Sequence, residues 1–134
     1  MNKFLLTLTA LIIISNSLFS QFTLKIEITD LRNNSGKVML EVFDEKEKVI
    51  SREMSEIKEY SCQFMIKNLM AGKYAARFYH DENQNNVMET NMFGKPTEGY
   101  GFSNNVKGTF GSPPFEKWLF DINGDKTIVL KPVY

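Results

Sequence analysis

Oxygen-bearing residues recur at alternate positions in the segment HDENQNNVME, residues 80–89. Carboxylate or amide side chains stand at Asp81, Asn83, Asn85 and Glu89, and Val87 can supply a main-chain carbonyl oxygen. Spacing of this kind wraps hard oxygen ligands around a calcium ion, which accepts mixed carboxylate and amide sets in flexible geometry. The segment is therefore a candidate calcium site composed of these five residues.

The calcium pattern departs from an EF-hand in two ways. Position twelve, where an EF-hand has a bidentate glutamate, is Met92, and no helix is indicated on either side. The sixth position, usually glycine, is Asn86, a residue type that tolerates positive φ better than most. Two carboxylates among the ligands predict weak binding, with a dissociation constant of about 10⁻⁴ to 10⁻³ M. Asparagine and aspartate also cap turns through side-chain to main-chain bonds, and this second interpretation remains open.

A stretch rich in glycine and aromatic residues, residues 91–105, follows the candidate metal loop. Tyr100 and Phe102 flank Gly101 and would form an aromatic platform for a polar ligand such as a sugar, with nearby polar side chains as hydrogen-bonding groups. Alternatively, the same aromatic residues form a satellite core that packs the loop onto the domain. The candidate ligand-binding residues are His80, Glu98, Tyr100, Phe102, Ser103, Asn104 and Asn105.

No catalytic constellation is complete in the sequence. There is no G-x-S-x-G elbow, no H-E-x-x-H pair and no phosphate-binding loop. His80 is the only histidine, so it cannot build a zinc site alone; it is either a hydrogen-bonded residue at the sheet rim or a general base. We expect a protein that is not an enzyme. The enzymatic alternative is a small hydrolase that uses His80 with Glu98.

Short segments of alternating apolar and polar residues indicate β-strands. Residues 22–29 and 37–43 alternate strictly, and together they look like an antiparallel hairpin. Residues 44–59 are highly charged and are expected to be a short helix or a mobile connection. Further strands are expected at residues 60–67, 73–81, 118–121 and 127–130.

Several short strands separated by turns, with little helix, predict an all-β fold. We expect a single antiparallel immunoglobulin-like or prealbumin-like β-sandwich with one long irregular loop, residues 81–116. Connections of this length are usually functional or disordered, and the aromatic residues of this loop favour order. Tyr74 follows a turn at the start of a strand and is either a tyrosine corner or a plain core residue. Cys62 shares its strand phase with Phe64 and Ile66, which indicates a small buried hydrophobe and not a reactive thiol.

The first twenty residues have the order of a secretory signal peptide. A basic start at Lys3 precedes an apolar run, and small polar residues precede the expected cleavage after Ser20. The apolar run is too short to span a bilayer comfortably, so we expect no transmembrane segment after cleavage and one domain at residues 21–134. That domain would be secreted or periplasmic.

The expected mature chain is nearly neutral. Removal of Lys3 leaves fifteen Lys and Arg residues against sixteen Asp and Glu residues. Without a basic excess to neutralise phosphates, nucleic acid is not an expected partner. Cys62 is the only cysteine, so no disulfide can form within the chain.

Four stretches of the sequence together resemble a known bacterial family. They are LRNNSGKV (31–38) with the following VFD (42–44), LMAGKYAARFYHDENQN (69–85), NMFGKPTEGYGFSNN (91–105) and FGSPPF (110–115). The chain resembles the secreted proteins catalogued as domain of unknown function 2141, and its leader resembles those of Bacteroidetes-like secreted proteins. The resemblance implies an envelope location and an all-β fold but no activity. The family loop usually reads HDENGNG, and here Gln84 and Asn86 replace the two glycines.

These observations predict a secreted, non-catalytic β-sandwich module. Calcium would stabilise its 81–116 loop, and that loop would bind a glycan or another envelope component, such as an envelope protein. A third interpretation, besides the hydrolase, is a protein-interaction module that uses an exposed strand edge.

Overall fold

The computed structural model describes residues 20–134, so the predicted leader lies outside the described residues except for Ser20. No helix in that range is long and apolar enough to cross a membrane. Two short 3₁₀ turns, η1 (Ser103–Asn105) and η2 (Phe115–Lys117), accompany the strands. The strands are β1 (Gln21–Ile28), β2 (Lys37–Asp44), β3 (Val49–Glu56), β4 (Cys62–Met70), β5 (Gly72–Asp81), β6 (Tyr100–Phe102), β7 (Phe120–Ile122) and β8 (Lys126–Leu130).

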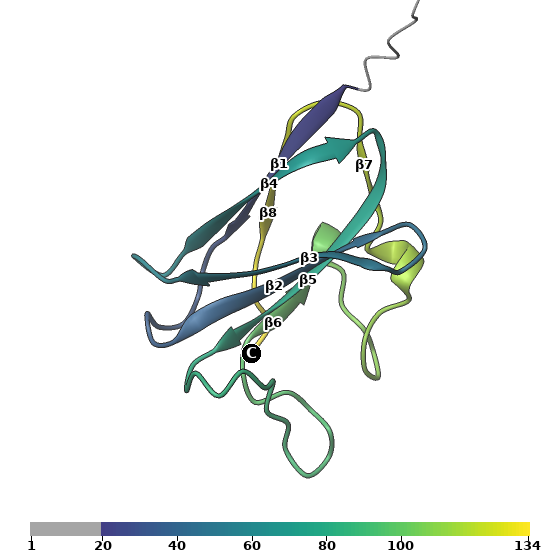
Figure 1. The fold of residues 1–134 in the computed structure, drawn as a ribbon. Helices are drawn as coiled ribbons and strands as arrows, with labels where there is room; N and C mark the ends of the chain where they lie inside the picture. The colour runs from purple at the N-terminus through teal and green to yellow at the C-terminus, as the bar shows by residue number, and fades with distance from the viewer. Residues whose placement is uncertain (1–19) are drawn as a thin grey trace, which may run out of the picture.

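The strands form two sheets that pack against each other as layers (Figure 1). The smaller sheet has the order β4-β1-β8, and the larger has the order β3-β2-β5-β6, with β7 pairing to the start of β5. All neighbouring strands are antiparallel except β1 and β8, which run parallel. The predicted all-β sandwich is therefore confirmed.

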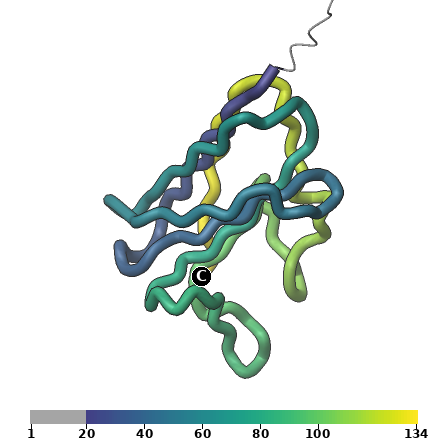
Figure 2. The backbone as a smooth tube through the Cα atoms, viewed as in Figure 1, coloured from purple at the N-terminus to yellow at the C-terminus, as the bar shows by residue number. Residues whose placement is uncertain are grey.

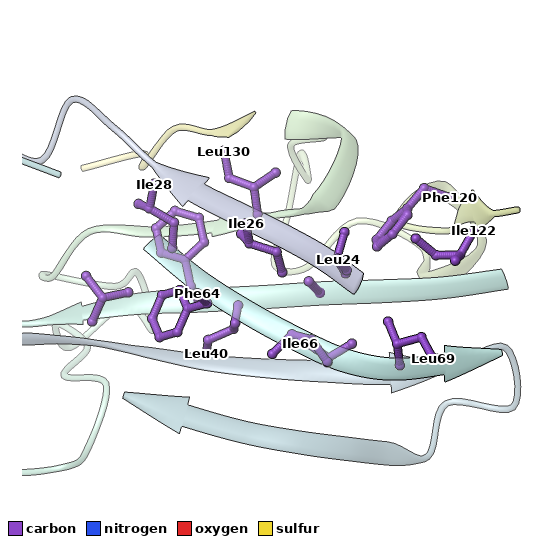
Figure 3. Packing of buried hydrophobic residues seen from close by; sticks show 14 of the residues in the cluster. Leu24, Ile26, Ile28, Leu40, Phe64, Ile66, Leu69, Phe120, Ile122 and Leu130 are labelled. Carbon is purple, nitrogen blue, oxygen red and sulfur yellow. The ribbon is translucent and has the colours of Figure 1, made fainter. Parts of the chain in front are cut away.

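The main core lies between the two sheets and contains the inward-facing residues that the alternation identified. Figure 3 shows side chains from β1, β2, β4 and β8 meeting in one cluster, with Phe120 and Ile122 of β7 at one end. Burial of these side chains is the main source of stability for a domain of this size. The cluster includes Leu24, Ile26, Ile28, Val38, Leu40, Val42, Phe64, Ile66, Leu69, Phe78 and Leu130.

The expected hairpin of the first two strands is wrong. β1 pairs with β4 and β8, whereas β2 pairs with β3 and β5, so residues 29–36 cross from one sheet to the other. Alternation with period two shows which face of a strand is buried, but it does not identify the neighbouring strand. Both strands bury one face in the same core, and this is compatible with either arrangement.

The expected helix or mobile connection at residues 44–59 is also wrong. After a turn closed by the Asp44 side chain, β3 runs antiparallel to β2 at the edge of the larger sheet. Its core-side phase carries Ser51, Glu53 and Ser55, which lie opposite the buried Val42, Leu40 and Val38. An edge strand with polar residues on both faces has no apolar alternation, and only its pairing with β2 reveals it.

The long loop is ordered and contains β6 and η1. Between β5 and β6 it extends away from the sandwich at the bottom of Figures 1 and 2. Its later part packs on the outer face of the larger sheet, where a second cluster joins Phe43, Ala75, Phe102 and Trp118. The Phe102 and Trp118 ring centroids lie 4.4 Å apart. Phe102 therefore belongs to the satellite core that the sequence offered as an alternative to a binding platform.

Tyr74 forms a tyrosine corner, one of the two interpretations that the sequence left open. Its hydroxyl donates to the main-chain carbonyl of Met70 at 2.7 Å, and its ring packs against the main core. The bond closes the turn between β4 and β5, which passes the chain from one sheet to the other.

We expect Tyr74→Phe to lower the free energy of unfolding by about 1 kcal/mol, because it leaves the Met70 carbonyl without this partner and preserves the ring. Urea unfolding followed by tryptophan fluorescence measures the change. Tyr60→Phe is the matched control, because the Tyr60 side chain is 54% exposed. Equal effects of the two substitutions would contradict a structural role for the corner.

Candidate functional site

His80, near the end of β5, is fully buried and uses both ring nitrogens. Nε2 lies 2.7 Å from the carbonyl oxygen of Ser35, and Nδ1 lies 2.9 Å from the hydroxyl of Tyr134. Because a carbonyl only accepts, Nε2 carries a hydrogen, and Nδ1 of a neutral ring then accepts from Tyr134. The same hydroxyl accepts the Arg32 main-chain N–H at 2.9 Å. His80 thus joins the end of β5 to the 29–36 connection and to the C-terminal Tyr134, and it offers no free nitrogen.

Asp81, the last residue of β5, is also fully buried. Its Oδ1 accepts the main-chain N–H of Asn85 at 3.2 Å, and its Oδ2 accepts that of Asn86 at 2.8 Å. The Asp81 carbonyl lies so close to Gly36 that a Cβ there would stand 1.9 Å from it, and the φ of Gly36 is +71°. Glycine at position 36 therefore allows the end of β5 to pass the turn before β2.

The predicted metal ligands gather in the loop that follows. The amide nitrogens of Asn83 and Asn85 both lie 2.5 Å from Oε1 of Glu89. The amide oxygens of the same two residues accept main-chain N–H groups two residues further on, at 3.2 and 3.0 Å. Asn86 has a φ of +63°, so asparagine does adopt the conformation usually assigned to glycine at this position. These contacts are the Asx turns of the second interpretation, and the groups that converge on Glu89 are amide nitrogens, not the oxygens that a cation would need.

A small hairpin, residues 89–98, brings Glu98 back beside this loop. The carbonyl of Glu89 accepts the Thr97 N–H at 2.9 Å, and the Asn91 side chain closes the tip by accepting two main-chain N–H groups. Oε2 of Glu98 accepts the Glu89 N–H at 3.4 Å. Oε1 of Glu98 is buried and has no hydrogen-bond partner among the described residues.

The surroundings of Glu98 disfavour its charge. The residue is 4% exposed. Burial raises the pKa of Glu98, and the negative charges of Asp81 and Glu89 raise it further, while the main-chain N–H groups of Glu89 and Glu82 oppose part of the effect. By contrast, Glu82 has favourable partners: a hydrogen bond from Asn33 and the charge and hydrogen bond of Arg32 outweigh the effect of burial and hold the pKa of Glu82 below the usual range.

Three predicted ligand-binding residues instead use their polar atoms within the protein. The Ser103 hydroxyl donates to the Trp118 carbonyl at 2.5 Å and accepts the Ala76 N–H at 2.9 Å. Asn104 donates to the carbonyls of Lys117 and Leu119, and Asn105 bonds to the main chain of Val129 and Lys131. These contacts dock the loop onto the sheet.

A groove of about 620 Å³ crosses the outer face of the larger sheet. The register aligns four side chains in one row across it, because Met54 pairs with Met39, Met39 with Tyr79, and Tyr79 with Tyr100. Tyr100 was predicted as a ligand-binding residue, but the other three were not. Met39 and Tyr79 lie in the outward phase of their strands, and large apolar residues in that phase are the signal that could have identified them.

A charged row lies beside the apolar one. Arg52 and Arg77 flank Glu41, which accepts their Nε–H groups at 3.1 and 2.7 Å. Burial raises the pKa of Glu41, but the hydrogen bonds from Arg52 and Arg77 outweigh it, so the net pKa lies below the usual range. Asn86 and Met88 of the loop complete the groove wall.

Cys62 fits its predicted structural role. The side chain is half-buried against the main core, and burial raises the pKa of its thiol to about 12. A thiol with this pKa is almost entirely protonated at neutral pH, so it is a poor nucleophile.

The fold and the site define an all-β sandwich that carries a structured, acidic loop beside a groove on one sheet. The chain belongs to the family described as "Uncharacterized protein conserved in bacteria (DUF2141)", whose model matches residues 26–129. This confirms the family resemblance of the sequence motifs. No curated protein matches the chain.

The ion network of Glu41 predicts a pH-dependent contribution to stability. Since the folded pKa is lowered, the contribution is present above the unfolded pKa of about 4.3 and is lost as pH falls through the folded value. We expect Glu41→Gln to reduce the free energy of unfolding by about 1 kcal/mol at pH 7, because both arginines are largely exposed and screened.

Urea unfolding at pH 7 and at about pH 3 tests this, with the difference from the parent protein shrinking toward zero at the lower pH. Glu116→Gln, an exposed carboxylate without an ion pair in residues 20–134, is the control. A difference that stays constant with pH would show that Glu41 acts through packing.

Proposed function

We propose that this protein is a secreted, non-catalytic module that binds an envelope glycan on the outer face of its larger sheet, beside the 81–116 loop. The observation that carries the proposal is the row of Met54, Met39, Tyr79 and Tyr100 in the groove. With strands about 4.8 Å apart, a row across four strands spans about 15 Å, a length that suits a short oligosaccharide.

The chemistry of the groove suits a sugar chain. Tyrosine rings offer apolar faces for the C–H faces of sugar rings, and their hydroxyls hydrogen-bond. Burial and the charges of Asp81 and Glu98 raise the pKa of Tyr79, so its hydroxyl remains protonated and can donate. Arg52 and Arg77 add guanidinium donors on the other side of the groove.

The contacts of His80 and Glu98 support a non-catalytic role. The hydrolase alternative requires these two side chains together in a concave pocket. Instead, both ring nitrogens of His80 bond to Ser35 and Tyr134, while Glu98 bonds to the main chain of Glu89. Neither residue lines the groove.

The strand-edge alternative has weaker support. β3 has a free edge within the described part of the chain, because its only partner strand there is β2. However, Arg52, Glu53 and Glu56 place charges along this edge, a common device that prevents further pairing. Sheet extension by a partner is therefore a less favoured role for β3.

Binding to an array of bacterial envelope oligosaccharides tests the proposal. We expect Tyr79→Ala and Tyr100→Ala to weaken binding of a recognised oligosaccharide by about tenfold or more, since each removes a large contact face. Met65→Ala is the matched control, because Met65 is 49% exposed on β4 of the other sheet. Absence of binding to any oligosaccharide at millimolar concentration, or equal losses in all three variants, would contradict the proposal.

Secretion is tested separately. β1 begins at Gln21, directly after the expected cleavage site. We expect the protein recovered from the periplasm or medium to have the intact mass of residues 21–134. Recovery of an uncleaved chain in the membrane fraction would indicate that residues 1–20 act as an anchor.

A further inference from the structure

Two bends of the long irregular loop carry apolar side chains that are almost completely exposed. Met92, Phe93 and Phe110 are 91%, 87% and 97% exposed, the highest values among the large apolar residues of the described chain. The next in order, Met54 and Val87, are each 60% exposed. Single exposed apolar residues are common, but exposure this complete in two bends of one loop indicates a surface that a partner covers.

The first bend is a closed turn whose main-chain donors are already satisfied. The carbonyl oxygen of Asn91 accepts the Gly94 N–H at 2.9 Å, and its side-chain oxygen accepts the N–H groups of Phe93 and Lys95 at 2.9 and 3.0 Å. Gly94 has a φ of +77°, a conformation that suits glycine. An N–H group without a partner is costly in an apolar medium, and here residues 93–95 all have one. The turn can therefore leave water without losing hydrogen bonds from these groups.

The second bend places Phe110 between two glycines. A Cβ at Gly108 would stand 1.9 Å from the carbonyl oxygen of Gly111, and Gly111 has a φ of +85°, so glycine allows the two sides of the bend to meet. The Trp118 ring N–H donates to the Pro113 carbonyl at 3.0 Å and holds the end of the bend against the larger sheet. Figure 1 shows both segments as open loops whose bends point toward the bottom of the view.

Both bends lack acidic residues and carry a lysine. Residues 90–97 and 104–115 contain no Asp or Glu, although the chain has sixteen, and they contain Lys95 and Lys107. Both lysines are exposed, and neither forms an ion pair within residues 20–134. A lysine beside exposed apolar side chains matches the negative potential and the apolar interior of an anionic lipid surface.

We propose that the 91–95 turn and the 108–111 bend dock on the surface of an anionic phospholipid bilayer. Met92, Phe93 and Phe110 enter the interface, and Lys95 and Lys107 lie at the headgroups. A protein partner would need two pockets that match the two bends, whereas a fluid bilayer accepts both without such a match. Docking of this kind is reversible, because the insertion is confined to the interface. It does not depend on glycan binding, since none of these five residues lines the groove.

Flotation of the purified protein with lipid vesicles tests the proposal. We expect the protein to bind vesicles of equal parts phosphatidylcholine and phosphatidylglycerol at about 1 mM lipid, and to bind phosphatidylcholine vesicles more weakly. Raising sodium chloride from about 0.1 to about 0.5 M should weaken binding to the anionic vesicles, because salt screens the lysines. Absence of binding to the anionic vesicles would overturn the proposal.

Substitutions in the two bends test whether both enter the lipid. We expect Phe93→Ser and Phe110→Ser each to lower the partition coefficient by about fivefold or more, with effects that multiply in the double variant. The thermal unfolding midpoint should stay unchanged, because both rings lie in water in the free protein. Tyr60→Ser is the matched control, since Tyr60 is a 54% exposed aromatic residue in the connection between β3 and β4. An equal loss in the control, or a loss confined to one bend, would show that the two-bend surface is wrong.

Charge and insertion are separated by further variants. Lys95→Gln and Lys107→Gln together should remove most of the preference for anionic vesicles, whereas Lys67→Gln, an exposed lysine on β4, should not. Phe93→Trp places a fluorophore in the first bend, and its emission should shift to shorter wavelength when anionic vesicles are added. A preference that survives loss of both lysines, or emission that does not shift, would contradict docking on an anionic bilayer.

Discussion

The end of β5 is the constraint on which the loop and its surroundings depend, because two polar side chains are fully buried there. Buried polar groups must find partners, and His80 and Asp81 find them in segments far apart in sequence. His80 connects the turn before β2 with the C-terminal segment through Ser35 and Tyr134. Asp81 receives two N–H groups of the loop that follows it. One strand end thereby fixes the start of the loop against the body of the sandwich.

The strands that bury a face in the core could be predicted from the sequence, because apolar residues alternate there. β1, β2, β4 and β5 appear close to their expected positions, and the short β7 and β8 lie near theirs. Strand partners could not be predicted in this way, since both sheets bury residues in one core and the alternation is the same for each. β3 was missed because Ser51, Glu53 and Ser55 occupy its core-side phase.

The site was predictable only where its residues are close in sequence. Asn83, Asn85 and Glu89 are close in sequence and do contact one another, through amide nitrogens and not through the oxygens that the metal pattern predicted. The place of Glu98 depends on a hairpin closed by the Asn91 side chain. Ser103 and its two asparagine neighbours illustrate the opposite error. Polar residues in a glycine-rich loop suggest ligand contacts, yet a long loop that crosses a sheet also needs hydrogen bonds to the main chain beneath it, and these residues supply them.

The groove and the acidic loop are physically connected. Asn86 donates its main-chain N–H to Asp81 and also lines the groove, and Met88 of the same loop lies on that wall. Tyr79 belongs to the groove, yet the charges of Asp81 and Glu98 act on its hydroxyl. The same loop therefore carries acidic side chains beside the end of β5 and forms part of the groove wall, so a change in its backbone would alter both surfaces.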